Sequence, residues 1–354
     1  MDTVSPFFFP KFIAQSPPRK NQHENNLVTE KKRNFASLLS NSHTVNMVHY
    51  ILTRFNLNLF PRDKYGNATL TEEWLENRFQ LFETYSLPSI KAQTSKNFYW
   101  LVLMDRDTPK FYLDRMYQHK EQCPNLRIIR VKPEGGPKFL LIFQQVIQKD
   151  FFKGRSTEDN LVLSTWMDND DSLSIDFVER LQNEAGNLPR QNPTFIIFHY
   201  GLQYFVKRNL AVNYRYDNNH FISLLESYGP QGVVRTAFGY GSHWSVFDFK
   251  DCGIHNVMNK NHPAWIEVVH GSNVSNDLFP RKYGYKPLTD GSVLKKQFGL
   301  DVVPDKHPVR LFFTFFIPRL IKVNIKHFYT RSLEKTGIKK KKTRKGEEEI
   351  KNEK

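Results

Sequence analysis

The sequence predicts an α/β fold in which a mostly parallel central sheet is flanked by helices. Over residues 47–167, short apolar runs alternate with helix-like segments, beginning and ending with a strand-like run. Alternation of this kind is typical of parallel sheets, because each connecting helix crosses over one face of the sheet. The chain has 354 residues, of which 39% are hydrophobic, so it is long and apolar enough to bury a core of this size.

The predicted helices carry start signals. Thr71 can cap a helix that has Glu72 and Glu73 in its first turn, where carboxylates complement the helix dipole. Thr108 and Pro109 mark the next helix in the same way, with Pro at its first position. Strands are expected at His49–Phe55, Phe98–Met104, Leu126–Val131 and Leu161–Met167, and helices at Glu72–Thr84, Pro109–His119, from Gly135-Gly136-Pro137 to Lys149, and at Asp176–Gln182.

The pattern divides the chain into four parts. Residues 1–46 are rich in Ser, Asn, Pro and Lys, and we expect a disordered leader there, with Met47 as an alternative start. Residues 47–310 form the folded domain, whose second half turns irregular up to about Tyr285. An aromatic and basic segment follows at 311–337, and 338–354 form a disordered charged tail.

Composition limits the classes of partner and compartment. The formal net charge of +15 favours polyanions, but no nucleic-acid-binding module accompanies it, so we expect no nucleic-acid partner. Cys123 and Cys252 stand alone, so the sequence suggests neither a disulfide framework nor a structural zinc site. This is consistent with a reducing compartment, and we expect a cytoplasmic location. Phe7-Phe8-Phe9 is too short for a signal peptide, and no stretch has the roughly 18 apolar residues of a membrane span.

Acidic residues directly follow the last predicted strand, as Asp168-Asn169-Asp170-Asp171. Open α/β sheets bind ligands at the carboxyl ends of their strands. Three carboxylates crowded there would repel one another unless a cation neutralised them. Oxygen ligands of this kind suit Mg²⁺ or Mn²⁺. The sequence therefore predicts a divalent metal held by Asp168 and Asp170, with Asp171 orienting a metal-bound water or contacting substrate hydroxyls.

Two other interpretations of the acidic residues stay open at this point. They could cap a helix that begins near Ser172. They could also belong to a calcium loop, although Leu173 stands where that loop needs Gly and a strand-like run precedes it where a helix should be. The residues that fit the calcium-loop positions are Asp168, Asp170, Ser172 and Glu179.

Six sequence blocks occur in one order over about residues 47–300, and their combination is specific although no single block is decisive. They are His49-Tyr50-Ile51-Leu52-Thr53-Arg54-Phe55-Asn56, Trp74-Leu75-Glu76-Asn77-Arg78 with Leu81-Phe82-Glu83, Pro88-Ser89-Ile90-Lys91-Ala92-Gln93-Thr94, Trp100-Leu101-Val102-Leu103-Met104-Asp105, Met167-Asp168-Asn169-Asp170-Asp171, and Trp265-Ile266-Glu267-Val268-Val269-His270-Gly271-Ser272-Asn273. In this combination the chain resembles the rhamnosyltransferase family, whose members are similar to GT-A glycosyltransferases.

The resemblance implies a GT-A-like enzyme that takes a sugar from a nucleotide-diphosphate sugar such as dTDP-rhamnose. Thr53 and Arg54 end the first strand, where such enzymes begin their nucleotide pocket, and an arginine there can pair with phosphate oxygens. Asp105, with Asp107 as the alternative, stands where such enzymes contact the base or the ribose. A surface position for Arg54 and a helix-capping role for the two aspartates are the structural alternatives.

The resemblance also implies residues in the second half of the chain. His270 is expected as the third metal ligand, because GT-A enzymes commonly complete the coordination with a late histidine. Gly271 beside it would let the backbone approach the diphosphate. An inverting reaction needs a carboxylate near the acceptor hydroxyl as its base. Glu267, Asp248 and Asp251 are all candidates, and the sequence does not separate them.

The expected function is metal-dependent sugar transfer to a glycan or a lipid-linked acceptor, with the irregular second half on the acceptor side. Residues 309–329 and the lysine run after them could rest on an anionic membrane at its inner face, or Leu311–Ile317 could be a core segment. Two alternatives use the same acids: a metal-dependent phosphotransferase or nuclease, and a non-catalytic polyanion-binding protein. No phosphate loop supports the first, since Gly135-Gly136-Pro137 lacks the following Lys-Ser/Thr.

Overall fold

The computed structural model describes residues 46–57, 68–69, 71–132, 139–152, 160–228, 234–241, 243, 245–270, 286–288, 290–305 and 307–335. The predicted charged tail lies outside the described residues, and so does the predicted leader apart from Asn46. The described residues belong to one compact unit. In the described part of the chain, no helix is long and apolar enough to cross a membrane.

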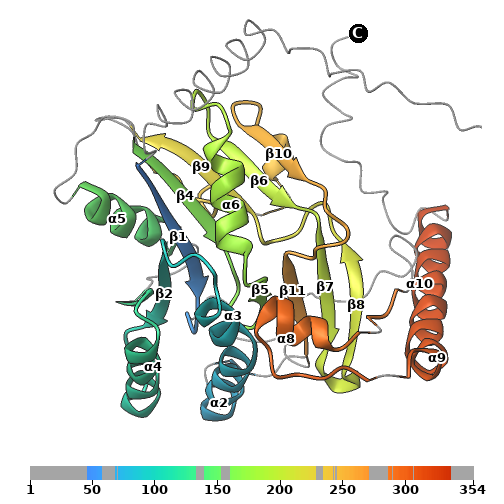
Figure 1. Cartoon of the computed structure of the whole chain (residues 1–354). Helices are drawn as coiled ribbons and strands as arrows, with labels where there is room; N and C mark the ends of the chain where they lie inside the picture. The colour runs from blue at the N-terminus through green and yellow to red at the C-terminus, as the bar shows by residue number, and fades with distance from the viewer. Residues whose placement is uncertain are drawn as a thin grey trace, which may run out of the picture. The chain divides into compact units, whose positions relative to one another are not determined.

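A seven-stranded, mostly parallel sheet forms the centre of this unit (Figure 1), which confirms the predicted fold class. Its spatial order is β10-β6-β9-β4-β1-β2-β3. Only β9 runs antiparallel to its neighbours, β4 and β6. The strands are β1 (Asn46–Arg54), β2 (Tyr99–Asp105), β3 (Leu126–Val131), β4 (Asn160–Trp166), β6 (Thr194–Phe198), β9 (Ser223–Tyr228) and β10 (Gly253–Val257).

The helices of the first half begin close to where the sequence predicts. Thr71 caps its helix as expected, its hydroxyl accepting a hydrogen bond from the Trp74 amide over 3.2 Å. The prediction for Thr108 is wrong: its hydroxyl donates to the Asp105 carbonyl, and Pro109 precedes the helix instead of occupying its first position. The bounds are α2 (Glu72–Leu81), α3 (Leu87–Lys91), α4 (Lys110–Gln122), α5 (Phe139–Phe152) and α6 (Phe177–Gly186).

Two π-helical segments interrupt otherwise α-helical runs, and both end just before an X-Pro pair. The first, Phe82–Ser86, joins α2 to α3 and is followed by Leu87 and Pro88. The second, Phe312–Phe316, is followed by Ile317 and Pro318. Proline has no amide hydrogen for the i→i−4 bond and crowds the preceding turn, so the helix widens there. This widening continues the first run to Lys91, beyond its predicted end at Thr84.

The second half is more regular than its sequence pattern indicates, because it builds a four-stranded sheet of order β5-β11-β7-β8. The two central strands, β7 and β11, are buried on both faces, so they lack the apolar–polar alternation that reveals a half-exposed strand. Helix α8 (Ser292–Phe298) packs Leu294 and Phe298 against this sheet. The strands are β5 (Ser172–Leu173), β7 (Tyr200–Phe205), β8 (Leu210–Arg215) and β11 (Trp265–Val269).

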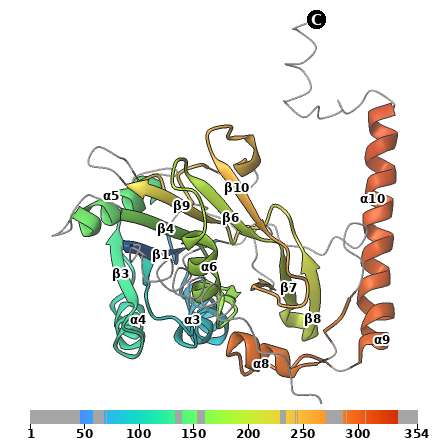
Figure 2. The ribbon, with the colours of Figure 1, turned by 45° about the horizontal axis from the view of Figure 1, so that its top comes forward.

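The C-terminal helices α9 (Pro308–Leu311) and α10 (Ile317–Lys335) lie beside the second sheet (Figure 2). They are held by Phe316, which is buried, together with Phe312, Ile317 and Leu320 around it. These side chains pack against Phe205, Leu210, Val212 and Val269 of the second sheet. The sequence left two interpretations of Leu311–Ile317 open. The packing of Phe316 and its neighbours agrees with the one in which this run is a core segment.

Candidate functional site

The acidic residues leave the central sheet at the carboxyl end of β4, beside the end of β1. The two strands are in parallel register, with Leu52 opposite Trp166. The Thr53 hydroxyl then donates to the Met167 carbonyl over 2.9 Å and accepts a hydrogen bond from the Trp100 indole. Thr53 is buried, and its hydroxyl links β1 to a side chain of β2 and to the residue that follows β4. The position of the acidic residues is therefore set by the sheet itself.

Asp168 is the accessible member of the acidic residues, with a side chain that is 34% exposed. Arg54 Nη2 lies 3.1 Å from Asp168 Oδ1, and the Trp166 indole donates to the same oxygen. The Arg54 guanidinium also lies 5.4 Å from the centre of the Trp166 ring. Burial opposes ionisation of Asp168, but the charges of Arg54 and His220 and the Trp166 hydrogen bond together outweigh it, so the pKa of this carboxyl is lowered.

Asp170 lies between a cation and a histidine, all three of them buried. Arg78 of α2 donates to Asp170 Oδ2 over 2.9 Å and also to the Asn169 side-chain oxygen. His270 Nε2 lies 2.6 Å from the same carboxylate oxygen. Burial by itself would raise the pKa of Asp170. The Arg78 charge and the contact with His270 together outweigh burial, so the pKa is lowered. The negative charge of Asp170 is thus compensated within the protein.

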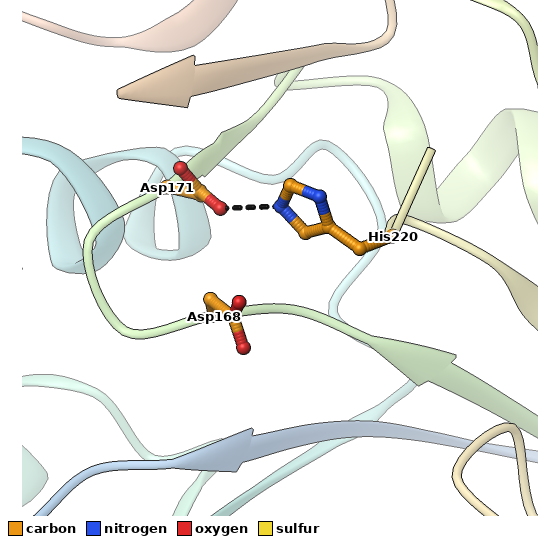
Figure 3. Close-up of side chains that lie close together, drawn as sticks. All are labelled: Asp168, Asp171 and His220. Carbon is orange, nitrogen blue, oxygen red and sulfur yellow. Dashed lines mark hydrogen bonds and ion pairs between the residues drawn. The ribbon is translucent and has the colours of Figure 1, made fainter. Parts of the chain in front are cut away.

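Asp171 pairs with His220, which comes from the segment before β9 (Figure 3). His220 Nε2 lies 2.7 Å from Asp171 Oδ2, and the Val268 amide donates to the other carboxylate oxygen over 2.8 Å. Burial and the neighbouring aspartates raise the pKa of Asp171 to about 7 despite the His220 contact. Burial alone would lower the pKa of His220, but the contact with Asp171 raises it to about 9. Unlike Asp170, Asp171 carries negative charge that its surroundings compensate incompletely.

A fourth buried carboxyl, Glu267 of β11, lies near the aspartates. Gln203 of β7 donates to Glu267 Oε2 over 2.6 Å, and the two residues are direct partners across the second sheet. Burial raises the pKa of Glu267, partly offset by His220 and the Gln203 hydrogen bond. A carboxyl with a raised pKa is suited to proton transfer near neutral pH.

A metal centre fits three of these side chains, and the donor chemistry supports it. Asp168, Asp171 and His220 each offer a ligand atom, and these atoms lie within 4.8 Å of one another. Two ligands of one Mg²⁺ ion lie at most about 4.2 Å apart, so small side-chain movements would bring all three onto one ion. Two carboxylate oxygens and an imidazole nitrogen are donors that Mn²⁺ accepts.

The family model described as "Putative rhamnosyl transferase" matches residues 63–282. The chain belongs to this family. The matched range includes all four carboxyls and both histidines of the site, and it agrees with the resemblance that the sequence blocks indicate. No curated protein sequence matches the chain.

Solved structures of the S. aureus protein TarS are similar to this family member at low sequence identity. The fragment 1–349 in complex with UDP has 10% identity and a TM-score of 0.33, and the match covers 63% of this chain and 60% of that one. The longer TarS structure has the same identity and TM-score, with 37% of its length covered. A second structure of the fragment has 9% identity and a TM-score of 0.32. The match thus spans less than two thirds of the TarS fragment.

In this rhamnosyltransferase-family chain, the two other interpretations of the acidic residues are wrong. Ser172–Leu173 is a strand that pairs with β11, and the next helix begins only at Phe177. The aspartates therefore cap no helix. Glu179, which a calcium loop would need as a ligand, accepts a hydrogen bond from Thr94 instead. A helix before the loop is also missing, because β4 leads into it.

Several predicted site residues of this family member lie apart from the metal trio. Asp170 and His270, predicted as metal ligands with Asp168, contact each other, and Asp170 also contacts Arg78. Asp105 ends β2, and its carboxylate accepts a hydrogen bond of 2.8 Å from the backbone amide of Asp107. Asp248 is exposed, and within the described residues no hydrogen bond or ion pair joins it to the aspartates. Asp251, a further candidate base, lies 3.9 Å from Arg235. Gly271, predicted near the diphosphate, is outside the described residues.

The sequence interpretation missed Arg78, His220 and Gln203. Arg78 lies inside one of the family-like blocks. Its sequence context does not distinguish it from an ordinary polar residue of an amphipathic helix. His220 follows Asn218 and Asn219 without any spacing typical of a ligand. A glutamine on a buried strand, such as Gln203, is the one signal that was available, because a buried amide needs a partner.

Proposed function

We propose that this chain is a metal-dependent glycosyltransferase, which moves a sugar from a nucleotide-diphosphate sugar to a glycan or lipid-linked acceptor. The description of its family suggests rhamnose as that sugar. The observation that carries the proposal is the meeting of Asp168, Asp171 and His220 at the carboxyl end of β4 in a member of this family. Both cysteines are free thiols, which supports a cytoplasmic location.

Asp168, Asp171 and His220 would hold the Mn²⁺ or Mg²⁺ ion. When bound, the ion supplies positive charge that offsets the charge developing on the leaving diphosphate. We favour Asp171 over Asp170 as a ligand, because Arg78 already neutralises Asp170. Asp170, His270 and Arg78 then hold the loop between β4 and β5 in place.

Arg54 is the residue we assign to the diphosphate. It lies beside Asp168 and against the Trp166 ring, which restricts its guanidinium to the edge of the site. A guanidinium held in this way can donate two parallel hydrogen bonds to phosphate oxygens. We assign Asp105, at the end of the adjacent strand β2, to the ribose or base, and Gly271 to the backbone approach to the diphosphate.

Glu267 is the residue we assign as catalytic base. It is buried next to the aspartates, its pKa is raised, and Gln203 fixes one of its oxygens. The other oxygen would accept the proton of the acceptor hydroxyl as the new glycosidic bond forms. Asp248 is the weaker candidate because its side chain is exposed and its described contacts lie elsewhere.

Thermal unfolding with a panel of nucleotide-sugars, each with and without Mn²⁺, tests the proposal. A ligand that binds only the folded state raises the melting temperature. We expect dTDP-rhamnose to stabilise the protein in a Mn²⁺-dependent way, and Asp168→Asn to remove this effect. Asp114→Asn, an exposed aspartate on α4, is the matched control and should keep it.

The outcomes separate the sugar from the reaction class. Stabilisation by uridine compounds alone would overturn the rhamnose assignment and leave the transferase. Metal-dependent hydrolysis of nucleic acid or of phosphate esters, without any effect of nucleotide-sugars, would indicate a nuclease or phosphotransferase. Metal-independent binding of polyanions alone would indicate a binding protein.

A further inference from the structure

Helix α10 presents a second apolar face that does not pack on the second sheet. Ile321, Ile325 and Phe328 follow one another at spacings of four and three residues, which places them on one side of the helix. Ile325 is 63% exposed and Phe328 is 79% exposed, and the neighbouring Tyr329 is exposed as well. Large apolar side chains grouped on one exposed face mark an interaction surface.

The same helix is anchored at its beginning. Phe316 is buried, and Ile317 and Leu320 pack with it against the second sheet. Beyond Leu320 no described helix or strand runs alongside α10 in either view (Figures 1 and 2). The rest of the 19-residue helix is about 22 Å long at ~1.5 Å per residue. A surface of this length is therefore presented from a fixed base.

The charge of this segment is strongly positive. Lys322 is exposed and precedes Ile325 by three residues, which places it at the border of the apolar face. Between Pro308 and Lys335 the sequence has one acidic residue, Glu334. The basic residues of the same range are Arg310, Arg319, Lys322, Lys326, Arg331 and Lys335, and Lys339-Lys340-Lys341-Lys342 follow in the sequence.

We propose that α10 docks in the plane of an anionic lipid bilayer, with Ile321, Ile325 and Phe328 inserted at the interface. A helix with an apolar face bordered by basic residues is suited to this surface, because lipid headgroups attract the cations while the apolar side chains leave water. A second copy of the chain is disfavoured as the occupant, since two such helices would bring like charges together. Nucleic acid would leave the apolar face exposed.

Docking would also place the candidate site relative to the bilayer. The anchored end of α10 packs on Val269, which follows Glu267 by two residues and directly precedes His270. This inference does not depend on the proposed sugar transfer, because it is about binding to a lipid surface alone.

Sedimentation with vesicles tests the docking of the full chain. We expect binding to vesicles of phosphatidylcholine with phosphatidylglycerol, weakened by added salt, and little binding to phosphatidylcholine alone. The double variant Ile325→Ser/Phe328→Ser should bind at least about tenfold more weakly, because it removes two buried apolar side chains. Lys322→Gln should bind about fivefold more weakly.

Matched controls keep the result specific. Phe111→Ser on α4 removes a phenylalanine that is 68% exposed, and Lys250→Gln removes an exposed lysine, so neither should change vesicle binding. Circular dichroism of each variant checks that it folds. Equal binding of all variants, or no binding by the native chain, would overturn the proposal. So would a native dimer, detected by analytical ultracentrifugation, that the double variant converts to a monomer.

Discussion

His220 Nε2 lies 2.7 Å from Asp171 Oδ2, although 49 positions separate the two residues in the chain. The pair is buried, and Asp168 and Asp170 lie close enough to influence it electrostatically. This edge of the sheet therefore collects more carboxylates than its arginines neutralise, which is the electrostatic condition for binding a divalent cation.

The two histidines of the site are expected to differ in metal binding. His220→Asn should weaken Mn²⁺ binding by roughly tenfold or more, because it removes one donor of the trio. His270→Asn should change Mn²⁺ affinity by less than about threefold, since its partner Asp170 keeps the contact with Arg78. Isothermal titration calorimetry measures both affinities. The reverse order would assign the metal to Asp170 and His270 and remove Asp171 from the metal site.

Arg78 is expected to contribute to folding stability through its buried ion pair. Arg78→Met leaves the Asp170 carboxylate buried with only His270 beside it, and should lower the free energy of unfolding by about 3–5 kcal/mol. Urea denaturation measures this change. The double variant Arg78→Met/Asp170→Asn should be destabilised by clearly less than the sum of the two single changes. Simple additivity would show that the ion pair contributes nothing.

The stability contributed by Glu83 is expected to depend on pH. Burial alone would raise the pKa of Glu83, but His119 and Arg115 outweigh it and lower the pKa to about 2. Because the folded pKa lies below the unfolded value of 4.5, the contribution is complete above about pH 5 and is lost as the pH falls toward 2.

Glu83→Gln should therefore lower the free energy of unfolding by about 1–2 kcal/mol at pH 7, less than the full pKa shift implies because the carboxylate is partly exposed. At pH 3 the difference between variant and native protein should be smaller. Urea denaturation at the two pH values provides the comparison. A difference that stays constant with pH would mean that packing, not charge, is lost in the variant.

Two glycines are expected to respond in opposite ways to the same substitution. A Cβ on Gly201 would lie 2.2 Å from the buried Trp265 ring, so Gly201→Ala should destabilise the protein by about 1–3 kcal/mol through overpacking. Gly186 ends α6 with open space around it, so Gly186→Ala should be neutral or stabilising by up to about 1 kcal/mol. Melting temperatures distinguish the two. A Gly201→Ala melting temperature as high as that of Gly186→Ala would indicate that the second sheet moves to accept the methyl group.

The first half of the fold and the place of the acidic residues could be predicted from the sequence. Local signals determine both: alternating apolar runs, a threonine cap, and acidic residues directly after a buried strand. The strands of the second half could not be predicted as well. Strands such as β7 and β11 are buried on both faces, and their pairing depends on residues far away in the chain.

By itself the sequence determined that carboxylates follow β4 at a ligand-binding edge, and that these residues belong with the family-like blocks around them. Only the tertiary structure decided which side chains meet there. It brought His220 to Asp171 and Arg78 to Asp170, and so distinguished two neighbouring aspartates that look alike in the sequence. The physical reason is that the charge state of a carboxyl depends on burial and on cations within a few ångströms, and chain folding sets both.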